Sequence, residues 1–76
     1  MLYENYTMKK YNVTILDKDT MIERTVDLVA ENVRDAHKSA IWSLNDFESE
    51  EVVNIRDDDG ILLYSSGDGF VDYSHP

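Results

Sequence analysis

The feature that most constrains the fold of this chain is a change in the spacing of its apolar residues. Residues 10–16 and 21–30 alternate between apolar and polar side chains, which is the period-two pattern of half-buried β-strands. Residues 32–45 instead place apolar side chains three and four positions apart, as one face of an α-helix does. Residues 51–56 and 61–66 return to strand-like composition. The sequence therefore predicts the element order β-β-α-β-β.

The strand-like segments are expected to pair as two hairpins. The polar stretch DKDT at residues 17–20 forms the first turn, and DDDG at residues 57–60 forms the second. Gly60 suits the positive φ that such a turn favours. Alternation sets one face of each strand toward the core and leaves the other face open. The side chains expected to face inward are Tyr11, Val13, Ile15, Ile22, Val26, Leu28, Val53 and Ile55, and those on the open face are Asn12, Thr14, Glu23, Thr25 and Asp27.

The helical segment carries its own start signal. Asn32 is the expected N-cap, and Asp35 sits three residues later, where a carboxylate favours the positive end of the helix dipole. The helix is expected to end at Asn45 or Asp46. His37 lies at the edge of the apolar face and is expected to be a boundary residue rather than a ligand or a base. The apolar face is formed by Val33, Ala36, His37, Ala40, Ile41 and Leu44.

A chain of 76 residues is one domain, and a domain this short buries only about 60% of its unfolded surface. The economical packing is an α+β fold: an antiparallel four-stranded sheet with one helix across one face. Residues 67–76 are expected to be a loose tail or an edge strand. Residues 1–7 are either a flexible arm ahead of Met8 or a segment that packs on the body. The lack of cysteine and of a long apolar run suggests a cytoplasmic protein without a membrane span.

Charge is distributed unevenly along the chain. The net charge is −9, and residues 41–76 contain nine acidic side chains against a single basic one, Arg56. Such a surface repels nucleic acid and anionic membranes and attracts proteins with basic surfaces. We therefore expect no direct binding to nucleic acid or membrane.

Catalytic and metal chemistry find little support in the sequence. The DDDG stretch fails the EF-hand pattern, because position 1 of that loop would be Ile55 and position 12 would be Ser66. There is no nucleophile elbow and no glycine-rich phosphate loop. The many carboxylates lie in expected turns and on exposed strand faces, where nothing drives their pKa values apart. We expect no enzymatic activity, no cofactor and no metal.

Protein binding is the function that the residues favour. Trp42 falls outside the apolar helix face, on the side of Lys38, which suits either a contact anchor or a cover for the sheet edge or the N-terminal arm. Tyr64, Phe70 and Tyr73 either bind a partner or close the core. The acidic surface either binds a basic partner or serves solubility alone. The expected partner-binding residues are Trp42, Asp46, Glu48, Glu50, Glu51, Asp57, Asp58 and Asp59, within a set of acids that also includes Asp68 and Asp72.

In its length, acidic balance, lack of cysteine and compact α+β pattern, the chain loosely resembles small bacteriophage-encoded inhibitors. These include anti-CRISPR proteins, anti-restriction proteins that mimic DNA, and inhibitors of uracil-DNA glycosylase. The resemblance implies an inhibitor that occupies a basic nucleic-acid groove on a host enzyme, with no individual residue carried over. The alternative is a small assembly protein that self-associates, for example as a homodimer, through a sheet face or edge.

Overall fold

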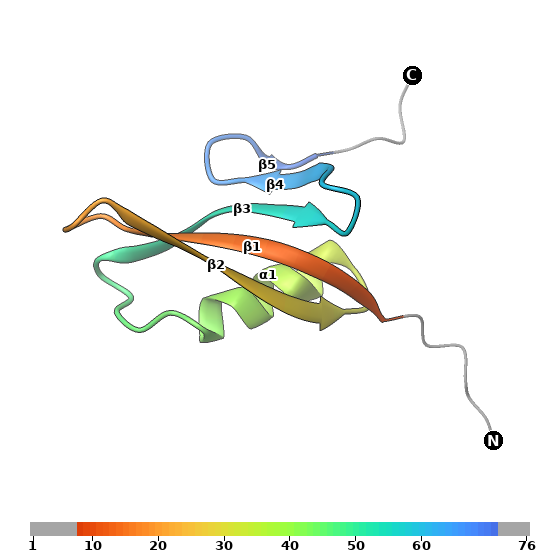
Figure 1. Cartoon of the computed structure of the whole chain (residues 1–76), viewed down its shortest axis with the longest axis horizontal. Coiled ribbons are helices and arrows are strands. Elements are labelled where there is room, and N and C mark those ends of the chain that lie inside the picture. The colour runs from red at the N-terminus through yellow and green to blue at the C-terminus, as the bar shows by residue number, and fades with distance from the viewer. Residues whose placement is uncertain (1–7, 72–76) are drawn as a thin grey trace.

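The computed structural model of the protein describes residues 8–71. Within them, one antiparallel sheet with the strand order β2-β1-β3-β4-β5 is covered on one face by a single helix (Figure 1). The α+β class and the expected order of the first five elements are confirmed. The elements are β1 (Lys9–Asp17), β2 (Ile22–Ala30), α1 (Val33–Trp42), β3 (Glu50–Asp57), β4 (Leu62–Ser65) and β5 (Gly69–Phe70).

The expectation of four strands is wrong, because a fifth strand follows β4. Gly69 adopts a φ of 79°, a value that glycine reaches without strain, and the chain reverses direction there. Phe70 then pairs with Tyr64 and Gly69 with Ser65. The short edge strand expected within residues 67–76 is therefore residues 69–70. Residues 1–7 and 72–76, which include Tyr73, lie outside the described residues.

The core lies between β1, β3 and the helix. Alternate residues of β1 are buried, and the helix turns two alanines, Ala36 and Ala40, toward them. These small side chains allow the helix to approach the sheet closely. Asn32 caps the helix as expected, since its side chain accepts a hydrogen bond of 2.9 Å from the Asp35 N–H. The buried core consists of Tyr11, Val13, Ile15, Ala30, Ala36, Ala40, Val52 and Ile55.

The expectation that Val53 faces the core is wrong, because β3 contains a bulge. Thr14 pairs with Asn54 and the next residue, Ile15, pairs with Val52, so Val53 is an extra residue on β3. The extra residue shifts the alternation by one position. As a result Val52 is buried and Val53 only half-buried.

Ile22 is also placed differently from the expectation. It is 66% exposed although it shares the face of Val26 and Leu28. The β1–β2 hairpin extends beyond the end of the helix, so the helix does not cover its tip (Figure 1).

The aromatic residues of β4 and β5 close one side of the core. The rings of His37 and Tyr64 have centroids 4.5 Å apart, and Phe70 packs edge-on against His37 at 5.5 Å. Arg34 lies over the Phe70 ring at 4.4 Å. Burial lowers the pKa of His37, so its imidazole favours the neutral form in this cluster. Of the two roles expected for Tyr64 and Phe70, packing on the core is the one observed. His37 is half-buried at the edge of the helix face, as expected of a boundary residue.

Met21 in the β1–β2 turn holds a strained backbone conformation. Its φ is 61°, a left-handed value that costs a residue with a Cβ about 1–2 kcal/mol. We expect Met21→Gly to raise the free energy of unfolding by about 0.5–1 kcal/mol, since part of the relief is offset by the greater freedom of glycine in the unfolded chain. Urea denaturation measures the change. Met21→Ala is the matched control, because it shortens the same side chain but keeps the Cβ at the positive φ, and an equal gain from both variants would contradict this account.

Candidate protein-binding surface at the acidic end of the sheet

The predicted binding residues do not form one face. Asp46, Glu48, Glu50 and Glu51 lie at or before the start of β3, whereas residues 57–59 lie at its far end. A strand of eight residues is about 26 Å long, so the two groups are separated by nearly the length of the sheet. The residues of β3 between them, from Val52 to Arg56, carry no carboxylate. A row of acids along β3 therefore does not exist.

The acidic turn at residues 57–59 lies among basic side chains. It shares a shallow pocket with Lys9 and Lys10, which start β1. The Asp57 carboxylate accepts hydrogen bonds of 2.9 Å from the backbone N–H groups of Asp59 and Ile61, so it shapes the turn. Gly60 has the expected positive φ, 85°. The charge of this turn is thus partly offset and partly used for local structure.

The opposite end of the sheet concentrates negative charge. Three connections lie toward this end of the sheet: the β1–β2 hairpin, the α1–β3 loop and the β4–β5 turn (Figure 1). The Lys18 N–H donates to the Ser49 carbonyl over 2.6 Å and joins the first two. Only two basic side chains, Lys18 and Arg24, accompany eight acids, so this end carries −6 of the chain's net −9. We call this surface the acidic end: Asp17, Asp19, Glu23, Asp46, Glu48, Glu50, Glu51 and Asp68.

Glu50 serves the fold at this end rather than its outer surface. Its side chain is only 9% exposed and accepts a 2.6 Å hydrogen bond from the Asn45 N–H. Arg24 approaches the same carboxylate oxygen at 3.3 Å and also donates to the Ser43 carbonyl over 2.9 Å. Glu50 thereby ties the end of the helix, the following loop and β2 to the start of β3. The Asn45 N–H, followed by Arg24, holds the pKa of Glu50 below its usual range.

This arrangement predicts an acid-sensitive fold. Because the pKa of Glu50 is lower in the folded than in the unfolded chain, its ionised form stabilises the fold above the unfolded value of 4.5, and that stabilisation is lost as the pH falls through the folded value. We expect Glu50→Gln to melt at a lower temperature at pH 7 and to lose less stability between pH 6 and acid than the unchanged chain. Melting temperatures across that range measure the difference. Parallel curves for the two proteins would contradict the assignment.

Most carboxylates of the acidic end are exposed, and hydrogen bonds hold one of them, Asp46, in its charged form. The Ser49 hydroxyl and the Glu48 N–H, at 3.0 Å, donate to Asp46 and lower its pKa. Glu48, Asp19 and Glu23 are exposed, and Glu51 is half-buried with Lys18 at 3.7 Å. Together these side chains give the outer surface of the acidic end its negative charge.

Large apolar side chains are exposed at the same end. Phe47 is 66% exposed in the α1–β3 loop, and Met21 and Ile22 are exposed at the hairpin tip. Phe47 and Ile41 line a pocket of about 330 Å³ whose lining also includes Glu50 and Glu51. The acidic end therefore combines an apolar hollow with surrounding negative charge.

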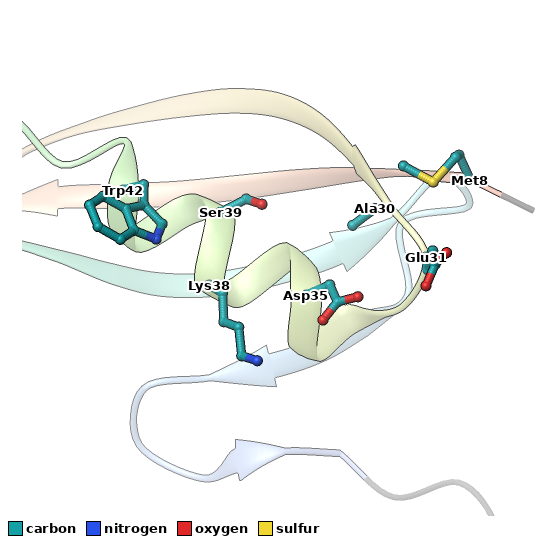
Figure 2. A pocket seen from close by; sticks show the side chains of 7 residues that line it. All are labelled: Met8, Ala30, Glu31, Asp35, Lys38, Ser39 and Trp42. Carbon is teal, nitrogen blue, oxygen red and sulfur yellow. The ribbon is translucent and has the colours of Figure 1, made fainter. Parts of the chain in front are cut away.

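Trp42 lies on the other flank of the helix. It is 84% exposed and lines a groove of about 680 Å³ that also includes Met8, Ala30 and Lys38 (Figure 2). It shares the side of Lys38, as the helical spacing predicted. Among residues 8–71 the Trp42 side chain is left largely uncovered, and it does not line the Phe47 pocket.

Sequence reasoning missed several residues of this surface. Asp17, Asp19 and Glu23 belong to the N-terminal half, which has almost balanced charge in sequence, and Phe47 stands alone in a loop. The pairing of β1 with β3 would have predicted these residues. Antiparallel pairing brings the end of β1, with its acidic turn, beside the acidic start of β3.

No protein-family model, curated protein or solved structure matches this chain. Among residues 8–71, no group of His, Cys, Asp or Glu side chains is arranged to hold a metal ion. Within that range no helix has the length and apolar character that crossing a membrane requires.

Proposed function

We propose that the protein is a non-enzymatic acidic binding protein that docks its acidic end on a basic surface of a protein partner. The observation that carries the proposal is the gathering of three separate chain segments into one end with a net charge of −6 and exposed apolar side chains. The lowered pKa values of Asp46 and Glu50 favour permanent charge, whereas a general acid needs a raised value.

The two kinds of side chain have different roles in this binding. Charge steers the encounter and selects partners, and it does so most strongly at low salt. Affinity comes mainly from a few apolar or aromatic anchors that become fully buried. Phe47, Ile41 and the hairpin residue Met21 are the anchors, and Asp19, Glu48 and Asp46 supply the exposed charge around them.

The resemblance to bacteriophage inhibitors gives the proposal its narrower form. The partner is then a cytoplasmic nucleic-acid-processing enzyme, and the acidic end occupies the groove that normally holds phosphates. Carboxylates contributed by three connections, rather than by one strand, would stand in for the phosphates. In this proposal Asp46, Glu48 and Glu51 contact the partner. Glu50 stabilises the fold instead, and residues 57–59 lie outside the contact.

A capture experiment with matched variants tests the proposal. The protein is immobilised, exposed to bacterial lysate and washed at low and then at high salt. Asp19→Lys/Glu48→Lys removes charge at the acidic end, and Asp58→Lys/Asp59→Lys makes the same net change at the opposite end. We expect a salt-released enzyme on the unchanged chain and on the second variant but not on the first. Equal capture by all three proteins, or none by any, would overturn the proposal.

A further inference from the structure

The described sheet ends in two unequal edges. β5 has two residues, whereas β2 has nine, and among residues 8–71 no strand pairs with the outer side of β2. Every second residue of an edge strand directs its backbone N–H and C=O groups outward. Edges are usually protected by short strands, proline, a bulge or charged side chains. β2 is long, contains no proline and pairs with β1 over nine positions without a shift, and its charged side chains are Glu23, Arg24 and Asp27.

An exposed groove lies at the Ala30 end of this edge, between the sheet and the helix. Arg34 and His37 contact the β4–β5 side of the sheet, so the opposite flank of the helix faces β2. That flank carries Trp42, and the groove beneath it reaches Ala30, the last residue of β2 (Figure 2). The open strand edge and the exposed tryptophan therefore belong to one surface.

We propose that β2 pairs antiparallel with β2 of a second copy of this chain, and that the Trp42 side chains of the two copies fill the space between their helices. The two sheets then form one continuous sheet with both helices on the same face. Glu23 is the one carboxylate of the acidic end that lies on this edge, and no step of the inference rests on the proposed function.

Charge selects the register of this pairing. A two-fold axis through Arg24 or Asp27 would set each of those residues opposite its own copy, and an axis through Thr25 would set Glu23 opposite Asp27. An axis through Val26 pairs Thr25 with Asp27 and places no like charges opposite each other. An axis through Leu28 would also avoid opposed like charges, but it would pair only residues 26–30 of β2. An axis through Val26 pairs all nine residues of the strand, so Val26 is the residue on the axis.

The spacing of the helices explains the tryptophan. α1 packs on β2 and β3, the strands that flank β1, so its axis lies over β1. In the paired sheet the two helices would lie three strand spacings apart, about 14 Å. Helices in direct contact are only about 8–10 Å apart, so a large side chain is needed in the gap.

Trp42 is positioned for this gap. The helix begins soon after β2 ends and is about 15 Å long, which brings its C-terminal residue alongside the middle of β2. The Arg24–Ser43 hydrogen bond of 2.9 Å fixes that position. Both Trp42 rings therefore approach the axis near Val26, and together they contribute about 300–500 Å² toward the roughly 1,000 Å² that a stable interface needs.

The charge distribution is compatible with this dimer despite a net charge of −9 per copy. Antiparallel pairing directs the two acidic ends in opposite directions, so each lies beside the less charged end of its partner. Added salt screens the remaining repulsion, since the Debye length is about 8 Å at 0.15 M.

Solution mass and tryptophan emission of the full chain test the proposal together. Trp42 is the only tryptophan, so its emission reports on the groove directly. We expect the mass to double with concentration and the emission to shift to the blue over the same range. A monomeric mass at all concentrations overturns the proposal, and a monomer with constantly blue emission would show that residues of the same chain cover the groove.

Variants locate the interface. Trp42→Lys is expected to weaken dimerisation about tenfold or more, whereas Ile61→Lys, on an exposed residue of the β3–β4 turn, is expected to leave it unchanged. A second experiment uses disulfide crosslinking, since the chain has no cysteine of its own. The two copies of Val26→Cys face each other across the axis and should form a disulfide on oxidation. Val29→Cys should not, because its two copies would lie about 20 Å apart. A dimer in which Val29→Cys crosslinks and Val26→Cys does not overturns this pairing.

Discussion

Ile55→Ala is expected to unfold a large share of the molecules under conditions in which the unchanged chain is folded. Ile55 is a fully buried residue of β3. Its partners across the sheet are Val13 of β1 on one side and Tyr64 of β4 on the other. Truncating a buried isoleucine costs about 2–5 kcal/mol, because transfer free energy is lost and a cavity remains. A chain of this length has a total stability of about 4–11 kcal/mol, so the loss is a large fraction of the whole.

Urea denaturation followed by circular dichroism measures this effect. Ile61→Ala is the control, because Ile61 is exposed in the turn that leads to β4, and its truncation should change stability by no more than about 0.5 kcal/mol. Equal losses in the two variants would show that Ile55 does not belong to a packed core.

Reversing charge at the acidic end is expected to give the largest effect on binding. Asp19→Lys/Glu48→Lys changes the net charge of that end from −6 to −2 without touching the Glu50 contacts. With a purified basic partner at low salt, we expect the association rate to fall about 10–100-fold and its dependence on salt to flatten. Stopped-flow or surface-plasmon measurements over a salt series provide the rates.

The opposite end of the sheet supplies the comparison. Asp58→Lys/Asp59→Lys changes the total charge equally, but these side chains lie beside Lys9 and Lys10 and far from the α1–β3 loop. We expect this variant to keep an association rate within about threefold of the unchanged chain, because fields near exposed charges are screened beyond about 8–10 Å. Equal losses in the two variants would mean that net charge, not the acidic end, attracts the partner.

Local features of the fold follow directly from the sequence. The two alternating runs are β1 and β2, the spacing of Ala36 and Ala40 marks the buried side of α1, and Asn32 and Gly60 occupy the cap and the turn expected of them. The open-face register is also as expected, since Asn12 pairs with Asp27 and Thr14 with Thr25. Each of these depends on residues close in sequence, or on a hairpin whose turn sets the pairing.

The bulge and the map of charge were decided by contacts between distant segments. The bulge at Val53 arises where β3 must match β1, so the run EVVNIR does not reveal by itself which valine is buried. Similarly, the acids of residues 46–51 join those of the first hairpin only because β1 lies in the centre of the sheet. Residues 57–59, close to them in sequence, end about 26 Å away because β3 is extended.

The sequence by itself thus determined the kinds of element, their order and the excess of negative charge, because periodicity and composition are local properties of the chain. Only the tertiary structure decided which turns meet, which carboxylates are exposed and that Trp42 lies beside an open strand edge. The physical reason is that strand order is set by pairing between segments far apart in sequence, and the position of each charge in space depends on that pairing.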